Sequence, residues 1–111
     1  MTRKIIATNK KLLVQFRLEA GCLGPDGIDH IVKFCQFAQK TIKPLNASFT
    51  VWDIAPRFDK SEPEIQYRIN GKRLDANHAN KYLQLFGQEL CGFEESLDEK
   101  LAEMIEQYFD R

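Results

Sequence analysis

Cys22 is the residue of this sequence that is best suited to nucleophilic chemistry. It stands between a strand-like run and the turn Gly24-Pro25-Asp26-Gly27, which opens a helix. A helix N-terminus stabilises a thiolate and lowers the pKa of a thiol. The position would therefore suit a thiol-dependent enzyme or a redox sensor.

The neighbours of Cys22 do not complete a catalytic set. A phosphatase-like loop needs an arginine six residues further on, where Ile28 stands, and a thioredoxin-like pair needs a cysteine three residues on, where Pro25 stands. His30 lies about two helical turns away. We therefore expect no catalytic residue, and we interpret the stretch as a shaped connection with Leu23 folded inward and Cys22 at least partly buried. A thiol-dependent function of Cys22 is the alternative.

Metal and cofactor sites are not indicated. The candidate metal ligands lack the short spacings of structural metal sites; they are Cys22, Cys35, Cys91, His30 and His78. The glycines at 21, 24 and 27 lack the Lys-Ser/Thr of a phosphate-binding loop and the spacing of a dinucleotide fingerprint. We expect no metal and no cofactor.

Aromatic residues on the first predicted helix indicate a binding surface. At about 100° per residue, one arc of this helix is apolar and forms its predicted core face. That arc holds Ile28, Ile31, Val32, Cys35, Ala38 and Ile42. Phe37 lies opposite the arc, with Phe34 and His30 nearby, so these three residues are the predicted contact surface for a partner.

A second, weaker candidate surface is basic and would bind RNA or phosphate. It consists of Lys4, Lys10, Lys11, Arg68, Lys72 and Arg73. Basic residues predominate in residues 1–46 and acidic residues in 94–111, but the formal net charge is zero and the pI is about 6.7. Dedicated nucleic-acid-binding domains are usually strongly basic, so the composition argues against a nucleic-acid partner.

The elements that must position these residues follow from hydrophobic periodicity and turn signals. Alternation predicts strands over 12–20, 47–55 and 64–71, with a two-residue hairpin turn at Asn70-Gly71. The first helix begins near Asp26 and ends at Lys43-Pro44. Further along, Asp75 caps a second helix, which closes at Cys91-Gly92, and a capping box from Ser96 to Glu99 begins the last helix.

The predicted fold class is α+β, in the order β-α-β-β-α-α. A three-stranded, mainly antiparallel sheet has the third strand in the middle and is covered by helices on one face. Residues 1–111 form a single domain, and residues 1–10 are a flexible tail or a short extra strand.

Composition favours a soluble, cytoplasmic protein. Hydrophobic residues make up 43% of the 111 residues, enough for one buried core. The sequence has no apolar run near the roughly 18 residues that span a bilayer, its basic start has too short an apolar run for a signal peptide, and three cysteines fit a reducing compartment. We expect a non-enzymatic protein-interaction domain, whose partner is an unknown protein or a second copy, with no membrane partner.

Overall fold

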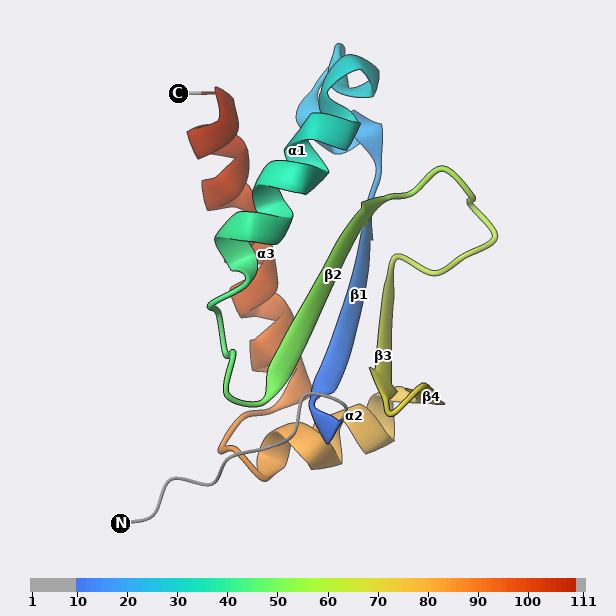
Figure 1. Cartoon of the computed structure of the whole chain (residues 1–111), viewed down its shortest axis with the longest axis vertical. Coiled ribbons are helices and arrows are strands. Elements are labelled where there is room, and N and C mark those ends of the chain that lie inside the picture. Colours follow the sequence, from blue (N-terminus) through green and yellow to red (C-terminus); the bar gives the residue numbers. More distant parts are fainter. Residues whose placement is uncertain (1–9, 110–111) are drawn as a thin grey trace.

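The computed structural model describes residues 10–109, which form an α+β domain with a mixed four-stranded sheet and three α-helices (Figure 1). The predicted tail or extra strand at residues 1–10, including Lys4, lies outside these residues except for Lys10. The elements are β1 (Leu12–Leu18), the 3₁₀ helix η2 (Ala20–Leu23), α1 (Gly27–Ile42), β2 (Thr50–Pro56), β3 (Ile65–Ile69), β4 (Lys72–Leu74), α2 (Ala76–Gln84) and α3 (Leu90–Phe109).

The sheet differs from the predicted one in its strand order, which is β2-β1-β3-β4. α1 crosses over the sheet and returns the chain beside β1, so β2 is parallel to β1, while β3 is antiparallel to β1 on its other side. Two of the three strand pairings are antiparallel, as expected, but the sheet has four strands instead of three. The expectation that the third strand would lie between the first two is wrong, because β1 lies between β2 and β3. The Asn70-Gly71 turn is confirmed by positive φ at both residues, and the short return after it forms the fourth strand.

Helices cover one face of the sheet. α1 and α3 lie side by side on this face, and α2 lies at one end of the strands (Figure 1). Alternate residues of β1, from Leu12 to Leu18, are buried beneath them, whereas Leu13, Gln15 and Arg17 lie half-buried on the other face. We call this second side, which none of the described helices covers, the open face.

Stacked aromatic rings fasten β2, and the residue before it, to α3 and to the segment that follows α2. Trp52 lies parallel to Phe93 of α3, with ring centroids 5.6 Å apart, and its indole Nε1 donates to the carbonyl of Leu45 at 2.7 Å. Phe49 stacks on Phe86 with centroids 4.5 Å apart. Such pairs contribute about 0.5–1.5 kcal/mol beyond the area that they bury.

The last two helices have other boundaries than predicted. The Asp75 cap is confirmed, since its carboxylate accepts from the backbone N–H of His78 at 2.8 Å. However, α2 ends at Gln84, and α3 already begins at Leu90, whose N–H donates to Asn80 Oδ1 at 2.8 Å. The predicted helix end at Cys91-Gly92 and the predicted start at Ser96 are wrong, because both lie within α3.

Candidate functional site

Cys22 lies on η2 and is exposed, so the expectation that it would be partly buried is wrong. The reason is that Leu23, which is buried as predicted, takes the inward position of this short helix. No hydrogen bond to the Cys22 thiol occurs within residues 10–109. Cys35 is buried, and burial raises the pKa of its thiol to about 11, while Cys91 is exposed on α3, 3.8 Å from Glu95 Oε1.

The candidate metal ligands of the sequence are not gathered into one group within residues 10–109. No group of three or more potential metal-ligating side chains of His, Cys, Asp or Glu occurs in the part of the chain that the structure describes.

The aromatic surface predicted on α1 is largely an internal contact. Phe34 is fully buried, so the expectation that it lies away from the core is wrong. Phe37 is half-buried, and the two rings pack against Tyr108 of α3, with centroids 5.5 and 5.7 Å away. His30 meets Tyr108 and Phe109 edge-on. Because α3 docks on α1, the aromatic residues of α1 lie on its buried side.

Two residues of the predicted core face of α1 are instead exposed to solvent. Ile28 is 68% exposed and Val32 is 50% exposed. Their exposure was not foreseen, because the periodicity of α1 alone contains no information about where α3 docks. Val32 lies directly beside the edge of the sheet, where it lines a groove together with Ile54 and Pro56.

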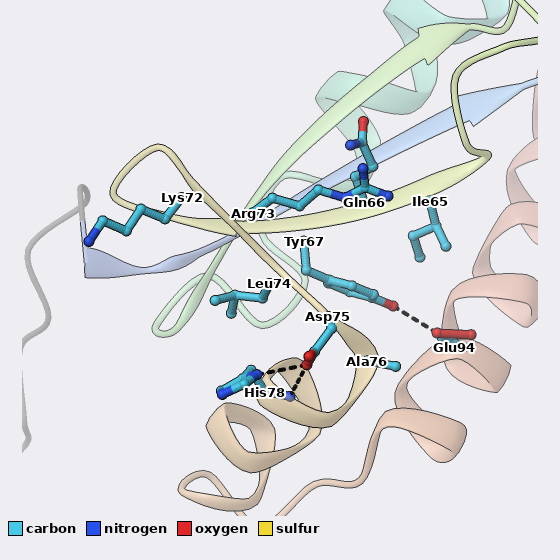
Figure 2. A pocket seen from close by; sticks show the side chains of 10 residues that line it. All are labelled: Ile65, Gln66, Tyr67, Lys72, Arg73, Leu74, Asp75, Ala76, His78 and Glu94. Carbon is cyan, nitrogen blue, oxygen red and sulfur yellow. Dashed lines mark hydrogen bonds and ion pairs between the residues drawn. The ribbon is translucent and has the colours of Figure 1, made fainter.

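The predicted basic residues are only partly brought together. Arg68 of β3 and Arg73 of β4 stand directly opposite each other on the open face. Lys72 is paired with Ile69 and leaves the hairpin in another direction than Arg73 (Figure 2). Lys11, just before β1, donates from Nζ to the carbonyl of Ala47 at 2.6 Å, and Lys10 is exposed beside it.

A pocket of about 730 Å³ lies between the β3–β4 hairpin, the start of α2 and the first turns of α3 (Figure 2). Two polar pairs line it: the Tyr67 hydroxyl donates to Glu94 Oε1 at 3.0 Å, and Asp75 bonds the imidazole Nδ1 of His78 at 2.7 Å. Burial raises the pKa of Tyr67 far above its usual value, with a further contribution from the charge of Glu94. Its phenol therefore stays protonated and serves as a structural donor.

These pairs connect secondary-structure elements and do not form a reaction centre. Tyr67–Glu94 ties β3 to α3, and Asp75–His78 closes the N-terminus of α2. Neither pair includes a nucleophile beside a base, which acyl or phosphoryl transfer would need. The pocket accordingly offers shape and charge for binding but not a catalytic set.

The outer edge of β2 is the most distinctive polar feature of the fold. β2 has a neighbour on one side only. The Phe49 carbonyl accepts from Leu12 N–H, and Arg57 N–H donates to the Leu18 carbonyl, so the odd-numbered residues of this segment face β1. Because backbone groups alternate in direction along a strand, those of Trp52 and Ile54 face away from the sheet.

The side-chain amide of Gln39 on α1 occupies this edge. Its Nε2 donates to the Trp52 carbonyl at 2.8 Å, and its Oε1 accepts from Ile54 N–H at 2.8 Å. A carboxamide carries the same donor and acceptor as a peptide group. Gln39 therefore takes the place of the N–H and C=O of one residue of an added strand, and nothing in the sequence alone marked it for this role.

The groove beside this edge has a volume of about 490 Å³ and is mostly apolar. Val32 and Cys35 of α1 form one wall, and Ile54, Ala55 and Pro56 of β2 form the other. Among the described residues, Trp52 N–H and the Ile54 carbonyl have no hydrogen bond on the outer side. Pro56 has no N–H to offer, so it marks the end of the edge at which a strand could pair.

Comparison with known proteins identifies no relative. No family model matches the chain, and neither a curated protein nor a solved structure matches it. Within residues 10–109, moreover, no helix is both long enough and apolar enough to cross a membrane.

Proposed function

We propose that this chain is a non-enzymatic protein-interaction domain and that its binding surface is the groove between α1 and the edge of β2. The occupant is an extended segment of another polypeptide, which adds a strand to β2. The position of the Gln39 amide on Trp52 and Ile54 is the observation that carries the proposal. At this edge a carboxamide already makes the two hydrogen bonds that the backbone of an added strand would make.

Exchange of this amide for the N–H and C=O of one residue of an added strand conserves both hydrogen bonds. An added strand would supply one donor and one acceptor in place of Gln39, and it would also reach Trp52 N–H and the Ile54 carbonyl. Strand addition gains affinity from such main-chain bonds, whereas pockets for alternate side chains give specificity. The apolar walls at Val32 and Ile54 would accept an apolar side chain of the segment.

This surface replaces the one predicted around Phe34, Phe37 and His30. Phe34 is buried, and Phe37 and His30 contact Tyr108, so α3 already covers much of that face. Ile28 and Val32, by contrast, are exposed apolar residues on a side of α1 that no other helix within residues 10–109 covers. We further propose a cytoplasmic location, which three free thiols favour.

The test uses seven-residue peptides selected from a displayed library against the intact protein. We expect bound peptides to protect the amide of Trp52 from hydrogen exchange, because this N–H gains a partner on binding, whereas Ile54 N–H already has one in Gln39. Val32→Glu should weaken binding at least tenfold, because it places a charge in the apolar groove. Leu85→Glu is the matched control, since Leu85 is also an exposed apolar residue but lies at the end of α2, away from the groove.

Gln39→Ala separates strand addition from simple groove binding. It removes the competing amide, so peptides that pair with β2 should bind several-fold more tightly to it. Peptides that map to another surface, or that bind Val32→Glu as well as the unchanged protein, would refute the proposal. A dimer seen in sedimentation and lost in Val32→Glu would instead identify the occupant as a second copy.

A further inference from the structure

Two arginines face each other across the β3–β4 hairpin without an acidic partner. The Asn70-Gly71 turn fixes the register, so that Arg68 stands directly opposite Arg73 on the open face. Like charges at directly opposite positions destabilise a strand pair. Within the described residues, no carboxylate forms an ion pair with either guanidinium.

Neutral groups orient Arg68 and leave donors free. Its Nε donates to Gln15 Oε1 at 2.9 Å, and Nη1 donates to the Gly71 carbonyl at 3.3 Å. Gln15 in turn donates to Asp53 Oδ2 at 3.3 Å. The acidic residue of this polar row is thus separated from Arg68 by an amide. The guanidinium of Arg73 has no hydrogen bond within the described part of the chain.

We propose that Arg68 and Arg73 form a binding site for a phosphate monoester, a function separate from the groove beside β2. A phosphate monoester carries about −1.5 to −2 charges and three terminal acceptor oxygens. It can accept from both guanidinium groups at once and remove their mutual repulsion. A planar carboxylate has two oxygens, which one arginine fork already saturates.

The surroundings of the pair fit a small phosphorylated group better than a nucleic-acid chain read by its bases. Leu13 is the cross-strand neighbour of Arg68 on β1, and Val51 is the next neighbour on β2. The strands place no aromatic side chain on this part of the open face, where alternate residues are Leu13, Gln15 and Arg17 on β1 and Val51 and Asp53 on β2. Base stacking, which dominates single-strand binding, has no platform here.

Charge reversal at one arginine gives effects of opposite sign on stability and on binding. In phosphate-free buffer, Arg73→Glu should raise the melting temperature, because it converts a repulsive cross-strand pair into an attractive one. The same variant should lose the stabilisation that inorganic phosphate confers on the unchanged protein. A merely solvated pair of arginines predicts no such loss.

The matched control is Lys72→Gln, which removes one positive charge from the same hairpin. Phosphate also stabilises proteins by exclusion from their surfaces, so the increment in melting temperature is compared between variants at equal ionic strength. Lys72→Gln should retain the increment, Arg73→Gln should lose most of it, and acetate should give little in any variant. Equal phosphate increments in Arg73→Gln and Lys72→Gln would overturn the site.

A second measurement identifies the source of the phosphate. An oligonucleotide with a 5′-phosphate is compared with the same oligonucleotide ending in a 5′-hydroxyl, and both are compared with inorganic phosphate. Tighter binding of the 5′-phosphorylated form, lost in Arg73→Gln, would assign the site to nucleotide ends. Binding of inorganic phosphate alone would assign it to free phosphate, and identical binding of both oligonucleotides to all variants would refute it.

Discussion

The three cysteines of this protein differ sharply in what their surroundings permit. Cys22 and Cys91 are exposed, whereas Cys35 lies in the core, where desolvation raises its pKa to about 11. Only the thiolate reacts with alkylating agents. Below its raised pKa the Cys35 thiol stays protonated, and because it is buried, an alkylating agent cannot reach it.

We expect iodoacetamide near neutral pH to label Cys22 and Cys91 well before Cys35. Peptide mass mapping of a labelling time course measures the three rates, and labelling in denaturant serves as the control that equalises them. Cys22 reacting far faster than Cys91 would favour the thiol-dependent function that remains the alternative for this chain. Similar rates for these two would indicate ordinary exposed thiols.

Glycine at position 27 is required by space and not by an unusual backbone angle. A Cβ there would lie 1.8 Å from the carbonyl oxygen of Ala20, because the start of α1 packs directly on η2. We expect Gly27→Ala to destabilise the protein by about 1–3 kcal/mol. Gly21→Ala, whose Cβ would meet no atom within 4 Å, should change stability by less than about 0.5 kcal/mol. Urea unfolding of both variants checks the contrast, which equal losses would contradict.

At the scale of elements, the continuity of α3 through Gly92 is the clearest departure from sequence expectations. Glycine usually marks a helix end because it adopts positive φ without cost. Here Gly87 has that conformation, with φ of 74°, and Gly92 lies inside α3. Burial of Phe93 against Trp52 holds this turn in the helix although its sequence favours a break.

Replacement of Gly92 should therefore stabilise the protein. Gly92→Ala gains about 0.5–1 kcal/mol in a helix, and its Cβ would meet no atom within 4 Å. Gly87→Ala is the control, which should destabilise because of its positive φ. Denaturant midpoints measure both. A loss of stability in Gly92→Ala would mean that the helix ends where the sequence suggested.

At the scale of the whole molecule, an aromatic cluster fastens the C-terminal half of α3 to α1. It consists of His30, Phe34, Phe37, Tyr108 and Phe109. These residues are separated by most of the chain, so their contacts close the domain from its first helix to its last. The cluster also explains why Phe37 contributes more to the fold than an isolated exposed ring would.

Phe37→Ser should lower the free energy of unfolding by about 1–3 kcal/mol, less than the 3–5 kcal/mol typical of a fully buried phenylalanine. Leu85→Ser is the control, since Leu85 is 77% exposed. Urea titration gives the stability, and sedimentation gives the oligomeric state of the same samples. If Phe37→Ser leaves the urea midpoint unchanged but abolishes a dimer, Phe37 contacts a second copy of the protein, as the sequence analysis predicted.

The sequence by itself determined those features that depend on neighbours along the chain. The turn at Asn70-Gly71, the cap at Asp75 and the inward anchor at Leu23 were predicted correctly, because each follows from backbone conformation or from alternation over a few residues. The small α+β class follows for the same reason. The opposed pair of Arg68 and Arg73 is also implicit in the hairpin, whose two-residue turn fixes the register.

Only the tertiary structure decided what depends on distant segments. The strand order required the path of the α1 crossover, and the burial of Phe34 required α3 to dock on α1. The exposure of Val32 and the hydrogen bonds of Gln39 to β2 follow from that same docking and crossover. Periodicity states that a helix has an apolar side, but the angle at which another element meets that side is set by long-range packing.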